Sequence, residues 1–200
     1  KNEPCSIVEQ TTCLDNGTER DVVKPEVGDL VFTEFMANPD IADDAVGEWF
    51  ELVATGSFDL NGLVAGNLPE SPKINITDEN CLAVGPGDRL LFARSTDASV
   101  NGGLPAPDYT FSFGLTNGGA SLFVGVGDTV IDTITWTGSA AGKSTSLDPA
   151  QESAAANDDE ANWCDGKTAY GDGDLGTPGA ANPPCDTSGM CMDGETLRAT

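Results

Sequence analysis

Histidine is absent from the 200 residues of this chain. Without imidazole groups the chain cannot build a Ser-His-Asp triad or a Cys-His pair, and it has no imidazole ligand for zinc or iron. Basic residues are scarce as well, because 9 Lys and Arg stand against 33 Asp and Glu, which gives a formal net charge of −24. A surface of this sign repels a nucleic-acid backbone. The composition therefore excludes most familiar hydrolase mechanisms and argues against nucleic-acid binding.

Long apolar runs are also missing from the sequence. No stretch approaches the roughly 18 uninterrupted apolar residues of a membrane-spanning helix, so membrane insertion is not expected. The chain opens at Lys1 without an apolar signal region, and we interpret it as a processed or excised segment. Its length suits one domain with tails. Most of the Leu, Ile, Val and Phe residues lie between Leu30 and Trp136, where the core is expected.

The cysteines show no Cys-x-x-Cys spacing. There are 6 of them, at Cys5, Cys13, Cys81, Cys164, Cys185 and Cys191. Because no histidine is present to complete a metal site, disulfide bonds are the favoured interpretation, and six cysteines allow 15 pairings. Disulfides in turn indicate an oxidising compartment.

A short repeat narrows the choice of pairing. Cys13-Leu-Asp-Asn-Gly-Thr-Glu-Arg20 recurs as Cys191-Met-Asp-Gly-Glu-Thr-Leu-Arg198, with Asp two residues and Arg seven residues after each cysteine. Another cysteine precedes each motif at short range. If the repeat is more than chance resemblance, local loops close at both ends of the chain and one long-range bond remains. The predicted pairs are Cys5–Cys13, Cys185–Cys191 and Cys81–Cys164.

The same repeat predicts how the chain is organised. Residues 1–27 are expected to form a Cys-loop connector, residues 28–183 one domain, and residues 184–200 the start of a second connector. The chain is then a piece of a longer protein in which the unit recurs. That protein is expected to continue past Thr200 with another strand resembling Leu30–Met36.

Short apolar runs separated by Gly, Pro, Asn and Asp are typical of antiparallel strands rather than of helices. Strands are expected near residues 30–37, 48–54, 61–65, 73–77, 89–94, 110–114, 120–125 and 129–136. Strands at this spacing favour an all-β, two-sheet sandwich. Residues 137–200 contain no Val, Ile or Phe and are expected to form a long loop that is pinned back through Trp163 and Cys164.

Several motifs carry a resemblance to a known family. The first three are Phe32-Thr-Glu-Phe-Met-Ala-Asn-Pro39, Gly47-Glu-Trp-Phe-Glu-Leu52 and Asp59-Leu-Asn-Gly-Leu63. The later ones are Gly85-Pro-Gly-Asp88, Leu115-Thr-Asn-Gly-Gly119, Val130-Ile-Asp-Thr-Ile134, Ser146-Leu147, Asn162-Trp-Cys164 and Gly176-Thr-Pro-Gly-Ala-Ala-Asn182. Over about residues 28–183 the chain resembles the bacterial lamin-tail domain. The resemblance implies an immunoglobulin-like β-sandwich that serves as a non-catalytic module of secreted or cell-surface bacterial proteins.

Three glutamates on the first two predicted strands are candidates for catalysis. Glu34, Glu48 and Glu51 lie near Trp49, and a carboxylate pair beside an aromatic ring is the arrangement that a glycosidase uses. A hydrolase using Glu48 and Glu51 is therefore one alternative. A small sandwich has little material to wall a deep cleft, so the favoured role is structural, with each glutamate capping loop amides near the Asn38-Pro39 turn.

Aspartate outnumbers glutamate, and Asp-Gly-Asp loops supply both the carboxylates and the main-chain carbonyls that calcium prefers. Asp172 and Asp174 in the last acidic loop are the candidate ligands, although no EF-hand spacing is present. A calcium-dependent carbohydrate-binding or adhesion domain is the runner-up interpretation, ahead of the hydrolase. The favoured prediction is a non-catalytic extracellular structural or adhesive module of a bacterial multidomain protein. Its partners would be other domains of that protein or surface polymers and proteins.

Overall fold

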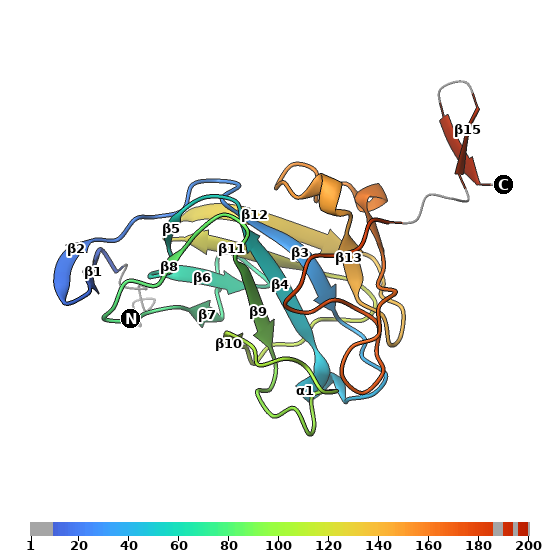
Figure 1. The fold of residues 1–200 in the computed structure, drawn as a ribbon, viewed down its shortest axis with the longest axis horizontal. Helices are drawn as coiled ribbons and strands as arrows, with labels where there is room; N and C mark the ends of the chain where they lie inside the picture. The colour runs from blue at the N-terminus through green and yellow to red at the C-terminus, as the bar shows by residue number, and fades with distance from the viewer. Residues whose placement is uncertain (1–9, 186–189, 194–195, 200) are drawn as a thin grey trace, which may run out of the picture.

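The protein is a sandwich of two main β-sheets, shown in Figure 1. The computed structural model describes residues 10–185, 190–193 and 196–199. In order across the larger sheet lie β10 (Tyr109–Thr110), β9 (Arg89–Ala93), β4 (Trp49–Ala54), β3 (Leu30–Met36), β13 (Thr145–Leu147) and β14 (Trp163–Asp165). Across the smaller sheet lie β12 (Thr129–Trp136), β11 (Ala120–Val126), β6 (Leu63–Gly66) and β7 (Ile74–Asn75). Only β9 and β10 pair in parallel among these strands, so the predicted all-β antiparallel sandwich is confirmed.

Short elements flank the two sheets. Three two-stranded sheets join β1 (Thr12–Asp15) to β2 (Thr18–Asp21), β5 (Phe58–Asp59) to β8 (Ala83–Val84), and β15 (Met190–Asp193) to β16 (Thr196–Ala199). The helical elements are α1 (Asp44–Gly47), η1 (Pro149–Gln151) and η2 (Glu160–Asn162). In the described part of the chain, no helix has the length and apolar character needed to cross a membrane.

The main core lies between the two sheets. Phe50 stacks on Phe92 with their ring centroids 4.7 Å apart, and Phe35 packs against Trp136 at 4.6 Å. Trp136 is buried as the sequence predicts. Trp49 is also fully buried but belongs to a second apolar cluster with Met36. Strands β3 and β4 therefore have apolar contacts on both of their faces.

A bulge in β3 explains how one strand serves both faces. The register against β4 shifts between Phe32 and Glu34, so that Thr33 is the extra residue. A single inserted residue reverses the alternation of side chains beyond it. Phe35 therefore joins the main core, whereas Glu34 lies on the opposite face of the sheet with Met36.

The C-terminal segment, residues 144–182, lies at one edge of the larger sheet and crosses its outer face with residues 170–182. In Figure 1 this orange and red segment crosses in front of β3 and β4. Asn182 donates from Nδ2 to the carbonyls of Thr33 (2.8 Å) and Leu147 (3.0 Å). The segment was expected to be a loop, but it also adds β13 and β14 to the sheet edge. These strands of three residues are too short to give a recognisable alternation.

Two disulfides, Cys13–Cys81 and Cys164–Cys185, replace the predicted pairs. All three predicted pairs are therefore wrong, since each uses at least one of these four cysteines. The Cα atoms of Cys13 and Cys81 lie 5.0 Å apart because β1 runs beside the loop before β8. The spacing of the cysteines in the sequence does not show that Cys13 and Cys81 lie close together in the fold. Cys5 lies outside the described residues, and Cys191 lies in β15.

Removing the second disulfide should loosen the cover of the outer sheet face. A Cys164→Ser, Cys185→Ser double variant is expected to lose about 3 kcal/mol of folding free energy, because the bond closes a loop of 21 residues. Urea unfolding against the unaltered protein measures the loss. Peptide mapping without reductant should first find the Cys164–Cys185 linkage in the unaltered protein, and its absence there would contradict the assignment.

Candidate functional site: a docked hairpin and buried carboxylates

The N-terminal hairpin has a turn that suits its sequence. Asn16 and Gly17 both have positive φ angles, 50° and 83°. Two-residue hairpin loops of type I′ require this conformation, and Asn-Gly is the favoured pair for it. The turn fixes the register of β1 on β2, in which Cys13 lies opposite Arg20 and Asp15 opposite Thr18.

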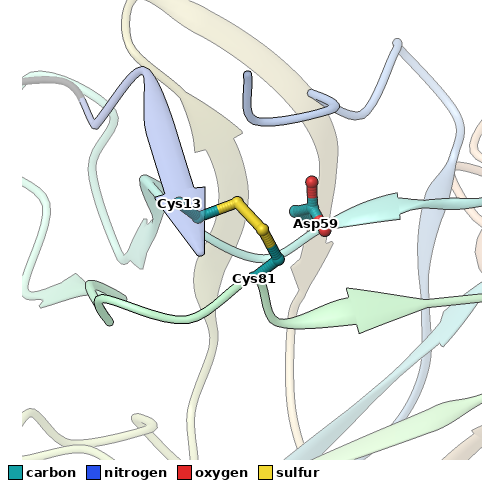
Figure 2. A group of neighbouring side chains, drawn as sticks. All are labelled: Cys13, Asp59 and Cys81. Atoms are coloured by element: carbon teal, nitrogen blue, oxygen red, sulfur yellow. A yellow bond between two sulfur atoms is a disulfide. The ribbon is translucent and has the colours of Figure 1, made fainter. Parts of the chain in front are cut away.

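The hairpin is attached to the end of the sandwich. Figure 2 shows the Cys13–Cys81 bond joining β1 to the loop that precedes β8, with Asp59 beside it. The backbone amide of Leu14 donates to the carbonyl of Glu79 at 2.7 Å, and the amide of Cys81 donates to the carbonyl of Leu14 at 3.0 Å. One covalent bond and a short parallel bridge therefore hold the same strand.

An ion pair holds the second strand of the hairpin. Arg20 donates from two guanidinium nitrogens to the two carboxylate oxygens of Asp59, at 2.6 and 2.9 Å. The Asp59 side chain is 1% exposed, and it also accepts from the amide of Val23 at 2.8 Å. Hydrogen bonding from Arg20 lowers the pKa of Asp59, against the effect of burial. Bidentate arginine pairs fix geometry as well as charge, so Asp59 sets the position of the hairpin.

Asn61 supports this anchor from the same motif as Asp59. Its side-chain amide donates to the carbonyls of Asp78 (3.0 Å) and Asn80 (2.9 Å), and its Oδ1 accepts from the amide of Leu82 (2.8 Å). These bonds shape the loop that carries Cys81. We call Cys13, Arg20, Asp59, Asn61 and Cys81 the hairpin anchor.

Cys13, Asp59 and Cys81 form a compact cluster that resembles a metal site in residue type. Their ligand atoms lie within 4.8 Å of one another, and no other group of three or more such residues occurs among those described. Metals bind the cysteine thiolate, however, and both sulfurs here share a disulfide. Asp59 is already paired with Arg20. The cluster therefore acts as an attachment point rather than as a metal centre.

Glu34 is buried on the outer face of the larger sheet, where it holds the C-terminal segment. Its carboxylate accepts from the hydroxyls of Ser144 (2.5 Å) and Ser146 (2.8 Å), and from the amide and hydroxyl of Thr177 (2.9 and 3.0 Å). Burial raises the pKa of Glu34, and these hydrogen bonds act in the opposite direction. All the polar partners of Glu34 named here belong to the segment that covers it.

Glu51 lies directly across from Glu34 on β4 and is fully buried. It accepts from Arg89 at 2.7 Å, from the hydroxyl of Thr33 at 2.9 Å and from the amide of Gly179 at 2.7 Å. Burial raises the pKa of Glu51 to about 7, although Arg89 favours the charged form. Glu51 thus forms an ion pair with Arg89 inside the larger sheet and joins that sheet to the covering segment through the Gly179 amide.

Glu48 precedes β4 and pairs with Arg94 at 2.8 Å. Burial raises its pKa, whereas hydrogen bonds from the Leu115 amide and from Arg94 lower it. The expectation that the glutamates cap the Asn38-Pro39 turn is therefore wrong, because Glu34, Glu48 and Glu51 hold other segments. The three do not line any of five principal cavities in the described part of the chain.

The two aspartates proposed for calcium have different surroundings. Asp172 is exposed, whereas Asp174 is 3% exposed. The Asp174 carboxylate accepts from the amides of Asp40 (3.2 Å) and Ile41 (3.4 Å). Asp174 thus caps the turn after Asn38-Pro39, the role that the sequence had suggested for the glutamates. Calcium binding by these two residues stays a prediction.

Arg20 is expected to contribute measurably to folding through the hairpin anchor. Arg20→Ala should lower the free energy of unfolding, because buried Asp59 loses its counter-ion while its own cost of burial remains. Asp15→Ala is the matched control, since Asp15 pairs with the same guanidinium at 3.0 Å but is half exposed. It should cost less than about 1 kcal/mol. Equal losses in urea unfolding would contradict the role of Asp59.

No family model, curated protein or solved structure matches this chain. The lamin-tail resemblance therefore rests on its motifs alone and stays a prediction. Sequence reasoning found the cysteines and the recurring Arg20 but missed its partner Asp59 and the supporting Asn61. The signal was present, because Asp59 and Asn61 belong to one of the quoted motifs. The sequence pattern does not show that the N-terminal hairpin folds against this motif.

Proposed function

We propose that the protein is a non-catalytic structural or adhesive module, resembling a lamin-tail domain, within a secreted or cell-surface multidomain protein. The observation that carries this proposal is the use of its buried acids. Glu34 and Glu51 bind the C-terminal segment, and Asp59 binds the hairpin. Side chains that could perform acid-base chemistry are thus engaged in holding the fold together.

An extracellular location is supported by two disulfides, because such bonds persist in oxidising compartments. The net charge of −24 adds a second argument. A surface with this charge stays soluble and repels other polyanions. The partners that we propose are accordingly neighbouring domains and surface polymers or proteins that are neutral or basic.

The resemblance gives the motifs a consistent structural meaning. Glu34 lies in the first quoted motif, Glu51 in the second and Asp59 in the third. Each of these three acids is buried and joins segments that are distant in sequence. This pattern supports a scaffold whose quoted motifs serve folding rather than turnover.

A hydrolase that uses Glu48 and Glu51 is the direct rival. We expect no turnover of glycan, ester or phosphoester substrates above a buffer blank. The measurement compares the unaltered protein with Glu48→Gln and Glu51→Gln, using circular dichroism to verify folding. Turnover that disappears in either folded variant would replace our proposal with an enzyme. A glycan and surface-polymer array, read with and without calcium, then looks for binding.

Calcium-dependent adhesion is the second candidate, with Asp172 and Asp174 as ligands. A specifically bound ion would raise the melting temperature by an amount that grows with the ratio of its concentration to its dissociation constant. Any cation, in contrast, can raise the melting temperature by screening the negative charges. Melting should be compared in calcium and magnesium at equal ionic strength. Asp172→Asn is the informative variant, because Asp174 also holds backbone amides. A calcium-specific rise that this variant removes would favour adhesion through calcium, and equal rises would withdraw the site.

A further inference from the structure

The repeat in the sequence is also a repeat in structure. β15 pairs with β16 in the register of β1 with β2, so that Cys191 lies opposite Arg198 as Cys13 lies opposite Arg20. Asp193 lies opposite Thr196 at the end of the second hairpin, as Asp15 and Thr18 do in the first. The chain therefore contains two hairpins of one design.

The residues that the two hairpins share include those that dock the first one. Cys13 forms the disulfide to Cys81, Arg20 pairs with Asp59, and Asp15 steadies Arg20 from within the hairpin. The other four positions of the motif differ between the copies, and of these Asn16, Gly17 and Glu19 are exposed in the first hairpin and Leu14 is partly buried. Cys13 and Arg20, which reach outside the first hairpin to Cys81 and Asp59, are thus among the four residues that both copies share.

The anchor of this sandwich is already filled by its own hairpin, since Cys81 is bonded to Cys13. We propose that β15–β16 is the docking hairpin of a second sandwich domain of the same kind. Cys191 bonds to the cysteine at the position of Cys81 in that domain, and Arg198 pairs with the aspartate at the position of Asp59. This assignment rests on the proposed function as one unit of a multidomain protein.

The chemistry of the bond is ordinary thiol oxidation. The two sulfurs join as two thiols lose two protons and two electrons to a small disulfide oxidant, which becomes two thiols. Cys185 is bonded within its own sandwich and stands six residues before Cys191. Two neighbouring domains would thus each hold one of these cysteines by a disulfide, and the linker between Cys185 and Cys191 spans at most about 20 Å. Such a linker holds the domains close together.

A fusion tests this directly. Residues 1–199 are followed by residues 22–185 of the same sequence, so that the second hairpin leads into a second sandwich, and Cys5 is changed to Ser. After refolding in a glutathione buffer, peptide mapping should find Cys191 bonded to Cys81 of the second copy as the main product. Arg198→Ala should slow that bond about tenfold, whereas the matched Thr196→Ala should not. Cys191 recovered free or in another pairing would overturn the inference.

A graft provides a second measurement within one sandwich. Residues 12–21 are replaced by the sequence of residues 190–199, with Cys5→Ser and Cys191→Ser, and a second graft keeps Asn16-Gly17 as its turn. At least one graft should form the bond to Cys81 and should lose stability with Asp59→Asn as the parent does. Failure of both grafts would overturn the inference. Neither the fusion nor the graft depends on the turnover assays. A failure of this inference can therefore be distinguished from a failure of the proposed function.

Discussion

An Arg89→Ala variant is expected to lose about 3–5 kcal/mol of folding free energy, because Glu51 would be left buried without its counter-ion. Glu51 is fully buried and the Arg89 side chain is 13% exposed, so solvent cannot replace the guanidinium. Stabilities of 5–15 kcal/mol are typical, which makes this a large part of the total. Urea unfolding at pH 9 measures the loss, because the Glu51 carboxyl, with a pKa of about 7, is then ionised in the parent protein.

The matched control for Arg89→Ala is Glu152→Ala. Glu152 binds the same guanidinium at 2.7 Å but is more exposed than Glu51, so its loss should cost about 1 kcal/mol or less. The Arg89→Ala defect should also shrink at pH 5, because a neutral Glu51 no longer needs the cation. A defect that equals that of Glu152→Ala, or that is independent of pH, would contradict the internal ion pair.

The stability of the protein is expected to fall as the pH rises from 4 to 8. Burial raises the pKa of Asp132 to about 6 and that of Glu51 to about 7. Between the unfolded pKa and the folded pKa, the native state binds more protons than the unfolded state, so a rise in pH favours unfolding. Asp59 acts oppositely, because its lowered pKa gives stability that is lost as the pH falls through it. We therefore expect maximum stability near pH 4–5.

Asp132→Asn isolates one contribution to this pH dependence. Asp132 accepts from the amide of Phe32 at 2.8 Å and from Asn157 at 2.7 Å, and an asparagine oxygen can accept both. The free energy of unfolding of the variant, relative to that of the parent, should rise by roughly 3 kcal/mol from pH 4 to pH 8. Asp128→Asn changes the net charge equally at an exposed site in the turn before β12. If the two variants behave alike, overall charge rather than burial sets the pH dependence.

Six of the eight predicted strands match observed strands of four to eight residues, namely β3, β4, β6, β9, β11 and β12, because each contains enough apolar residues to show its pattern. The predicted strands at residues 73–77 and 110–114 overlap only in part with β7 and β10, which have two residues each. The remaining strands in the described part have two to four residues and depend on their neighbours. β13, for example, contains Thr145 and Ser146, and it pairs because Glu34 and Leu147 find partners there. A local sequence pattern cannot show the pairing of β13 with β3, because the two strands are about 110 residues apart in the sequence.

The candidate site was harder to predict for a related physical reason. A carboxylate in a sequence does not show whether it faces water or a donor. Glu34, Glu51 and Asp59 look alike as letters, yet each is buried and meets a donor more than 35 residues away in sequence. Cysteine pairing failed similarly, since Cys13 and Cys81 meet only after the hairpin has docked.

The two disulfides also determine how the domain would respond to a pulling force. The docked hairpin lies at the left of the sandwich in Figure 1, and β13 lies on its right side. Tension applied at Cys13 and Cys185 passes through the two bonds, so the enclosed loops of 68 and 21 residues bear no load. Only the chain from Cys81 to Cys164 can be drawn out, to roughly 290 Å, about half of the reach of the same chain when reduced. The oxidation state of these cysteines thus sets the maximum extension of the chain between Cys13 and Cys185.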